Sequence, residues 1–506
     1  MIRMSVYGIN IILETDNPGV QYMLEYKTTE TKYSPWYKQW MTTQVKGKIY
    51  NKKHTDKKTG NIYFEIGVGF AAYLLKVFAK DISKADYDDV CSAVYQKTYR
   101  TQDFPELRDY QNQDILHCLK YKFGLFSCYT GYGKSQIIAV LAKYFYQDMG
   151  KKVLLVTPQT KPRDELIKRI DSLYGVKVST KIGQGNIQAM ITNGLMNRKE
   201  TKDPNEIPGF IKELESFDVI LVDEVEYCAN PGGFYIFSHA VNAEVRFGFS
   251  GTSDKSSAKL IGFTGGLNDP TVILNKDLIK YFGTSLVYRK PLDLTINNVV
   301  VKTNSMNPEN LKLGDIQDSG NIYIEVMTKI FTNPEVSKTI VRIAKAYPMT
   351  FIPINNLHNI IYEWIDKYFM KIFRILLVCG EGYIYYDLSG TRVKLNLQEA
   401  CDKIKNTEVD VIFSTSSGFR ALDFPNLKNI LLIQGKIAGS VLQQVGRVAR
   451  QKEFNIITLE PANGKSLPVH TKSQKIRKNM IKEYYSYCKI NEIKMTDADL
   501  CFACKH

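Results

Sequence analysis

A chain of 506 residues, 44% hydrophobic and 24% charged, has the composition of an ordinary globular protein, and its length suggests about three domains. No apolar segment near its start is long enough to span a bilayer, and no signal-peptide pattern follows Arg3, so we expect a cytoplasmic protein without membrane contact. The net charge of +15 favours nucleic acid as partner, and the nine cysteines are expected to be reduced.

Residues 1–100 are predicted to form a small, basic α/β domain. Val6–Leu13 alternates like a single strand, and Val20–Tyr26 fits a short helix or strand. Turn residues gather at 57–61, and Phe70–Lys80 has helical spacing.

Lysines and aromatic residues are concentrated between residues 27 and 58. Nine lysines stand there against Glu30 and Asp56, which gives a net charge of +7 in 32 residues. Lysines neutralise phosphates, and aromatic rings can stack on unpaired bases. The expected DNA-binding residues are Trp36, Lys38, Trp40, Lys46 and Lys48. The alternative is a solvated hairpin whose aromatic residues fill the core of the small domain.

Residues 101–294 alternate strand-like and helix-like runs, which is typical of a parallel sheet with crossover helices. Strands are expected at Val153–Val156, Ala189–Thr192, Val219–Val222 and Val245–Phe249.

A glycine-containing loop lies between the apolar segment 124–127 and a predicted helix, Gln136–Tyr146. Glycines let the backbone amides of such a loop surround phosphate oxygens. Lys134 would reach the β and γ phosphates of ATP, and the Ser135 hydroxyl would bind Mg²⁺. The residues assigned to ATP in this loop are Thr130, Gly131, Gly133, Lys134 and Ser135, although Cys128 replaces the usual first glycine.

Two carboxylates, Asp223 and Glu224, follow a buried strand, at the edge of a parallel sheet where ligands bind. Asp223 would hold Mg²⁺, and Glu224 would orient and deprotonate the attacking water. About twenty residues before the phosphate loop, Gln111 can pair with the edge of adenine, and an aromatic residue nearby can stack on the base.

Residues 295–465 contain a second strand and helix series. Its strands are expected at Met349–Ile354, Ile375–Cys379, Val409–Ser414, Ile430–Ile433 and Asn455–Leu459, and the polar segment Asn297–Leu313 reads as the junction. Near its end, Arg447 and Arg450 share one face of a helix. Such fork-shaped cations suit the charge that develops on a phosphoryl group.

The last segment, 466–506, is predicted to be a basic tail. From Lys465 to Lys494 its net charge is +6, which suits either a grip on duplex DNA or a solvated helix packed on the second lobe. Cys501, Cys504 and His506 provide fewer than the four ligands that zinc requires, so ordinary packing is favoured.

Taken in order, these motifs resemble those of the superfamily 2 helicases, over about residues 105–460. Within that superfamily the chain resembles the phage UvsW-type DNA helicases, through 246–252 and the small domain that precedes the adenine motif. The resemblance implies α/β architecture with two RecA-like parallel-sheet lobes, and ATP-driven 3′ to 5′ remodelling of forks, Holliday junctions, R-loops and D-loops.

The same resemblance assigns further residues. The adenine motif would comprise Arg108, Tyr110 and Gln111, and Asp423 would also bind ATP. Contacts to DNA would come from Pro158, Thr192 and Thr415. Coupling between nucleotide and DNA would involve Ser250, Gly251, Thr252 and Gln443. Glu226 and Ala421 depart from the usual pattern, and neither change removes a catalytic group.

Two alternatives stay open, an RNA helicase and a DNA-binding clamp that ATP only switches. The resemblance also suggests replication or recombination proteins as partners, a monomeric chain, and the host-cell cytoplasm if a phage encodes it.

Overall fold

The computed structural model describes residues 2–34, 39–129, 131–181, 183–192, 206–251, 278–283, 285–289, 294–313, 322–354, 361–415, 426–433, 445–446, 448, 451–465, 475, 478–479, 481–482 and 485–503. The chain divides into two compact units, Met1–Arg289 and Lys290–His506.

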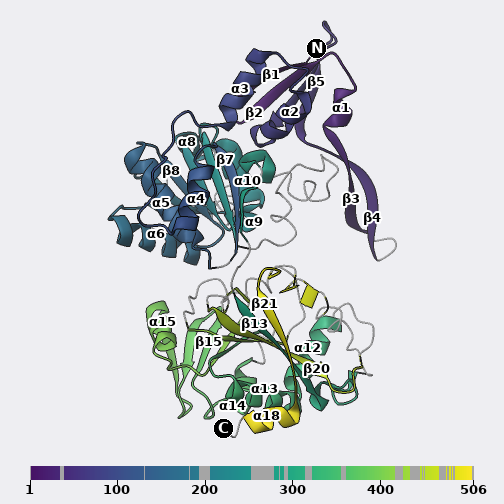
Figure 1. Ribbon diagram of the computed structural model, residues 1–506, viewed down its shortest axis with the longest axis vertical. Coiled ribbons are helices and arrows are strands. Elements are labelled where there is room, and N and C mark those ends of the chain that lie inside the picture. The colour runs from purple at the N-terminus through teal and green to yellow at the C-terminus, as the bar shows by residue number, and fades with distance from the viewer. Residues whose placement is uncertain are drawn as a thin grey trace. The chain divides into compact units, whose positions relative to one another are not determined.

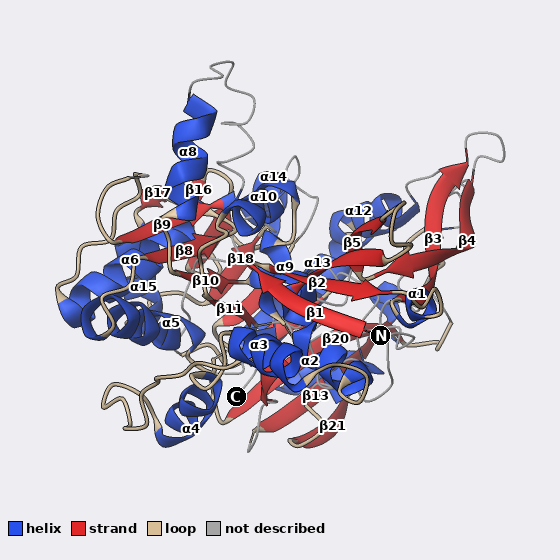
Figure 2. Ribbon diagram, turned by 90° about the horizontal axis from the view of Figure 1, so that it is seen from above, coloured by secondary structure: helices blue, strands red, loops and turns tan. Residues whose placement is uncertain are grey.

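The N-terminal part of the first unit is a four-stranded sheet of order β1-β2-β6-β5, with α2 and α3 packed beside it (Figures 1 and 2). A two-stranded ribbon, β3 and β4, extends from this sheet (Figure 1). The elements are β1 (Ile2–Tyr7), β2 (Asn10–Thr15), α1 (Val20–Met23), β3 (Glu25–Ser34), β4 (Gln39–Lys48), β5 (Tyr50–Thr55), β6 (Ile62–Gly67), η1 (Val68–Phe70), α2 (Ala71–Phe78) and α3 (Lys84–Val94).

One prediction for this region is wrong: Val6–Leu13 is not one strand. The chain turns at Gly8, whose φ of 57° few other residues adopt, and β1 and β2 form an antiparallel hairpin. The alternation of apolar and polar residues continues through Gly8, so the pattern gives no sign of the turn. The helix at 70–80 and the turn at 57–61 are confirmed.

The rest of the first unit is a six-stranded parallel sheet of order β12-β7-β11-β10-β8-β9. All four strands predicted for it are confirmed. Its elements are α4 (Asp109–Cys118), β7 (Phe123–Cys128), α5 (Lys134–Lys143), the π-helical η2 (Tyr144–Asp148), β8 (Val153–Thr157), α6 (Thr160–Tyr174), β9 (Ile187–Ile191), α8 (Glu206–Glu215), β10 (Val219–Asp223), α9 (Val225–Cys228), α10 (Pro231–His239), β11 (Val245–Ser250) and β12 (Ser285–Arg289).

The strands of this sheet are apolar on both faces because helices cover both. Alternate residues belong to different hydrophobic clusters: Val219 and Leu221 face one cluster with α5, while Ile220 and Val222 face the other with α10. The second cluster continues without a break into the core of the N-terminal sheet, including Phe64. The N-terminal domain and the first RecA-like sheet therefore share one hydrophobic core.

The second unit is a nine-stranded sheet of order β17-β16-β15-β18-β14-β19-β20-β13-β21, parallel except at the β16–β17 edge. Its elements are β13 (Thr295–Thr303), η3 (Asn304–Met306), α12 (Ile322–Thr332), α13 (Pro334–Ala346), β14 (Thr350–Pro353), α14 (Ile361–Tyr368), β15 (Ile375–Cys379), β16 (Gly382–Tyr386), β17 (Arg392–Leu395), α15 (Leu397–Lys405), β18 (Val411–Ser414), β19 (Asn429–Leu432), β20 (Glu453–Pro461), β21 (Lys489–Thr496) and α18 (Asp497–Ala503). The five strands predicted here are confirmed, as is the overall fold class.

The junction predicted at Asn297–Leu313 is wrong, because its first half is strand β13, paired with β20 and β21. The asparagines that made it look like a linker form a ladder across the sheet. Asn491 donates to Asn297, Asn297 to Asn455, and Asn455 to Asn429, at 2.9, 3.0 and 2.6 Å. A partly buried polar ladder of this kind helps to fix the register of neighbouring strands.

The C-terminal segment contributes to this second sheet. Strand β21 pairs with β13 over eight residues, and Leu500 of α18 is fully buried. Lys478 and Lys482 lie 3.6 and 3.7 Å from Glu492 of β21, so part of the positive charge counted in the tail is neutralised within the fold.

Candidate ATP site

The phosphate loop connects β7 to α5 at the carboxyl edge of the parallel sheet. Gly131 and Gly133 have φ values of 94° and 96°, a region that favours glycine, and α5 begins at Lys134 directly after them. A Cβ built on Gly133 would lie 2.5 Å from Gln111 Nε2. The loop therefore opens onto a helix N-terminus, where backbone amides attract anions, and its close contact with Gln111 requires glycine.

Gln111 connects the adenine motif to this loop. Its Oε1 accepts the Arg108 backbone N–H at 2.9 Å, and its Nε2 donates to the Tyr132 carbonyl at 2.7 Å. A side-chain amide has two N–H groups and two acceptor lone pairs, so one of each is left for an adenine edge. Arg108 donates to the Tyr110 hydroxyl at 2.8 Å, which orders the neighbouring aromatic ring.

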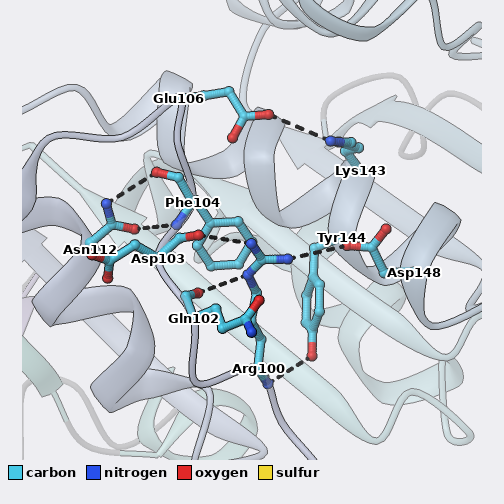
Figure 3. A network of polar contacts seen from close by, with 9 residues as sticks. All are labelled: Arg100, Gln102, Asp103, Phe104, Glu106, Asn112, Lys143, Tyr144 and Asp148. Atoms are coloured by element: carbon cyan, nitrogen blue, oxygen red, sulfur yellow. Dashed lines mark hydrogen bonds and ion pairs between the residues drawn. The ribbon is translucent and has the colours of Figure 1, made fainter.

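The segment before the adenine motif is held by a polar network (Figure 3). Arg100 donates to the carbonyls of Gln102 and Asp103 at 2.8 and 2.7 Å, and its guanidinium lies 4.5 Å from the centre of the Phe104 ring. Asn112 of α4 bonds both the N–H and the carbonyl of Phe104 at 2.7 and 3.1 Å. Lys143 of α5 pairs with Glu106 at 3.5 Å, as the same view shows. The network joins this segment to α4, which carries Gln111, and to α5, which follows the loop.

Asp223 ends β10, and Glu224 follows it at the same edge of the sheet. The Glu224 backbone N–H donates to Asp223 Oδ1 at 3.0 Å, and Glu224 has a φ of 48°. A non-glycine residue in this left-handed region is strained, and such strain is common at active sites. Burial, and then the charge of Glu224, raise the pKa of Asp223 to about 7, while Lys134 opposes the rise.

Three predicted motifs meet at Gly251, which follows β11. A Cβ built there would lie 2.7 Å from Lys134 Nζ and 3.4 Å from Glu224 Oε1. The lysine and the carboxylate predicted to act on the phosphates thus both reach the space beside Gly251. Ser250, beside it, is buried.

The residues present fit Mg²⁺. The oxygen donors at this site are the carboxylates of Asp223 and Glu224 and the hydroxyl of the half-buried Ser135, at the start of α5. Oxygen ligands of this kind are those that Mg²⁺ prefers. Glu224 Oε2 is buried and has no hydrogen-bond partner among the described residues. Burying two adjacent carboxylates is costly without a cation beside them, and Lys134 alone leaves the pKa of Asp223 raised.

We predict that metal-free stability depends on the pH through Asp223. Because its pKa rises from 3.8 to about 7 on folding, the folded state binds the proton more tightly than the unfolded state. The free energy of unfolding should therefore fall as the pH rises from about 4 to about 7, by at most about 1.4 kcal/mol per pH unit. Thermal unfolding in EDTA between about pH 4 and about pH 7 measures this pH dependence. The Asp223→Asn variant should lack the part of it that comes from Asp223.

Added Mg²⁺ should reverse most of this loss near neutral pH, because the cation binds the ionised carboxylate. Identical pH profiles with EDTA and with Mg²⁺ would contradict the assignment of Asp223 to the metal.

The residues assigned to DNA differ in where the structure places them. Pro158, Thr192 and Thr415 are buried, and the Thr192 hydroxyl accepts from Asn230 Nδ2 at 3.1 Å. A DNA contact at Thr192 would therefore come from the backbone of its loop. Lys48, at the end of β4, is exposed.

Several predicted site residues lie outside the described residues. They are Thr130, Thr252, Asp423, Gln443, Arg447 and Arg450, together with Trp36 and Lys38. Trp40 and Lys46 lie on β4, where the structure describes the backbone.

Arg246 belongs to the segment that carried the closer family resemblance, and its role here is structural. It is fully buried and donates to the backbone carbonyls of Ala243 and Phe237 at 3.0 and 2.8 Å, and to that of Ala240. Burial lowers its pKa to about 10. Sequence reasoning also missed Asp114, Tyr132 and Arg289, which contact one another beside the phosphate loop. Of these three, only Tyr132 had a signal, as a large apolar ring within a glycine loop.

Among the described residues, no helix is long and apolar enough to cross a membrane. The described part of the chain also holds no cluster of three or more His, Cys, Asp or Glu side chains with metal-binding geometry. Cys501 is exposed on α18, and Cys504 and His506 lie outside the described residues.

Comparisons with known proteins agree with the motifs. The type III restriction enzyme, res subunit, family matches residues 104–255. ATP-dependent DNA helicase uvsW of Enterobacteria phage T4 is 21% identical over 426 residues, which cover 79% of this chain and 78% of that protein.

Two solved structures are also similar. The crystal structure of T4 UvsW shares 16% identity, covers 98% of this chain and 99% of that one, and has a TM-score of 0.35. Dbp5 of S. cerevisiae, bound to RNA and ADP BeF3, shares 11% identity, covers 78% of this chain and 93% of its own, and has a TM-score of 0.47. The family match and the T4 DNA helicase agree with the order of the motifs, so the chain is similar to uvsW over most of its length and resembles the superfamily 2 helicases.

Proposed function

We propose that the chain is an ATP-dependent DNA helicase that translocates 3′ to 5′ and remodels branched DNA, such as forks, Holliday junctions, R-loops and D-loops. The observation that carries the ATP-driven part is the meeting of Lys134, Glu224 and Gly251 at one point of the first lobe. The DNA part is supported by the basic N-terminal domain and by the name of the T4 relative, a DNA helicase.

In the proposed reaction, Gln111 pairs with adenine while the phosphate loop and Lys134 hold the triphosphate. Glu224 orients water and takes its proton, and Arg447 and Arg450 stabilise the charge on the transferring phosphoryl group. Bound Mg²⁺ would neutralise phosphate charge, held by Ser135 and Asp223. Asp423 would complete the ATP contacts, and Ser250, Gly251, Thr252 and Gln443 would link nucleotide state to DNA.

We place DNA binding along the loops at Pro158, Thr192 and Thr415 and on the N-terminal ribbon. The ribbon strands β3 and β4 are each ten residues long. Near its base, Lys48, Lys52 and Lys53 are exposed. Because the N-terminal sheet shares its core with the first lobe, a branch bound by Trp36, Lys38, Trp40, Lys46 and Lys48 would be held in a fixed relation to that lobe.

The remaining expectations belong to the same proposal. The chain would act as a monomer in the cytoplasm, the host cytoplasm if a phage encodes it, beside replication or recombination proteins and without membrane contact.

The test compares ATPase rates with no nucleic acid, single-stranded DNA, duplex DNA, a four-way junction and RNA, at one salt concentration. We expect the junction to stimulate most, and a forked duplex to be unwound 3′ to 5′. Greater stimulation by RNA would contradict the DNA assignment, and ATP-dependent binding without strand separation would show a clamp instead.

A matched pair of lysine variants locates the DNA surface. Lys48→Gln should weaken junction binding and reduce the slope of log K against log salt by about 1. The control is Lys84→Gln on α3, which removes the same charge from a lysine paired with Asp88 at 3.1 Å. Equal effects of the two changes would contradict a localised site on the ribbon.

A further inference from the structure

Tyr132 stands between the two glycines of the phosphate loop, yet its side chain is only 1% exposed. Its ring packs against those of Tyr110 and Tyr129, with centroids 5.3 and 5.7 Å away. Its hydroxyl donates to Asp114 Oδ2 at 2.5 Å. Because burial raises the pKa of Tyr132 well above its usual range, the phenol keeps its proton and can serve as this donor.

Asp114 lies on α4, three residues after Gln111, and is 7% exposed. Its carboxylate also accepts from Arg289, from Nε at 2.8 Å and from Nη2 at 2.6 Å. Two-point pairs of this kind are stronger and more specific in geometry than single hydrogen bonds. Hydrogen bonding to Asp114 raises the pKa of Arg289.

Arg289 is the last residue of the first unit and ends β12. Its carbonyl accepts the Tyr129 backbone N–H at 3.2 Å, so its main chain also contacts the start of the loop. The point where the chain leaves the first unit is thus attached to the phosphate loop through both backbone and side chain.

Tyr132 is held at three atoms. Its N–H donates to the Tyr129 carbonyl at 3.1 Å, its carbonyl accepts from Gln111, and its hydroxyl is fixed by the Asp114–Arg289 pair. A loop with glycines on both sides has many accessible conformations, and ordering it on binding would reduce affinity. The contacts on Tyr132 restrict the loop before nucleotide arrives.

We propose that Asp114 and Arg289 are positioning residues for nucleotide binding, which hold Tyr132, and through it the phosphate loop, in the shape that receives the triphosphate. This inference rests on the proposed ATP site and is independent of which nucleic acid the chain acts on.

The test is the Kd of ATP for the full chain without nucleic acid, measured by calorimetry for the wild type and for Asp114→Asn. We expect binding about 5- to 150-fold weaker in the variant, the range of typical coupling between sites. Asp114→Asn combined with Arg289→Gln should be little weaker than Asp114→Asn alone, because residues that act as one unit give non-additive effects. Tyr132→Phe, which removes only the hydroxyl, should also weaken binding.

The matched control is Asp218→Asn, at the opposite end of β10. Asp218 pairs with Lys151 at 3.9 Å and accepts the Lys152 N–H at 2.8 Å, far along the strand from the loop. The Asp218→Asn variant should bind ATP with the wild-type Kd. The melting temperature of each variant shows whether its fold is retained. If Asp114→Asn does not fold, the Kd of ATP for Tyr132→Phe tests the positioning role instead.

Unchanged ATP affinity in the folded variants, or equal losses in Asp218→Asn, would overturn the positioning role. Wild-type chain that binds ATP but is not stimulated by DNA would contradict the proposed function alone. Wild-type chain that does not bind ATP would overturn both.

Discussion

Replacing Glu224 by glutamine is expected to lower ATP turnover by about 10²- to 10⁴-fold while ATP binding is retained. Glutamine has nearly the same shape, but it cannot take the proton of the attacking water. The structure favours this role because Glu224 lies at the strained turn after β10, with one carboxylate oxygen beside Gly251 and the other without a hydrogen-bond partner among the described residues.

Single-turnover hydrolysis and the Kd of ATP, measured on the same preparation, separate chemistry from binding. The control is Glu244→Gln, which changes an exposed carboxylate just before β11, at the opposite edge of the sheet. Turnover in Glu224→Gln at the wild-type rate would exclude Glu224 as the base. Loss of ATP binding together with turnover would show that the residue organises the site instead.

Replacing Gly69 by alanine is expected to destabilise the first unit by about 1–3 kcal/mol or more. A Cβ at Gly69 would lie 1.7 Å from the Ile279 carbonyl oxygen and 2.7 Å from the Gly283 nitrogen, both backbone atoms that cannot rotate away. Gly69 lies in η1, and residues 278–282 form a helical segment of the first lobe. The contact therefore joins the N-terminal domain to the lobe.

Thermal unfolding monitored by circular dichroism measures this effect. The control is Gly209→Ala in α8, which makes the same change at an exposed helical glycine with no atom within 4 Å of the new Cβ. That variant should be unchanged or slightly more stable, by about 1 kcal/mol, because alanine favours helix. Equal melting temperatures for wild type and Gly69→Ala would show that the two parts do not pack as closely as the structure has them.

The shared core also decides how the N-terminal domain should be tested. Deleting residues 1–100 would expose the apolar cluster around α10 and residues 278–282, so lost activity would not separate DNA binding from folding. The exposed lysines of the ribbon avoid this difficulty, because changing them leaves the cluster intact.

The sequence alone was sufficient to predict most strands, and the helix and the strand that flank the candidate ATP site lie where it predicted them. Runs such as Val219–Asp223 are apolar throughout because both faces of a parallel sheet are covered, and the glycines of the phosphate loop are required by its backbone angles. These are local requirements, so the residues themselves record them. The same reasoning failed at Gly8, where the alternating pattern runs through a turn, and at Asn297, whose polarity serves a ladder inside a sheet.

What only the tertiary structure decided depends on residues far apart in the chain. The Asp114–Arg289 pair spans 175 positions, the Asn297–Asn491 contact spans 194, and the core that unites the N-terminal sheet with the first lobe joins Phe64 to Phe282. Periodicity and spacing describe neighbours along the chain, whereas these contacts exist only once the sheets have formed. The sequence therefore predicted the residues of the candidate ATP site, and the fold determined which distant residues contact them.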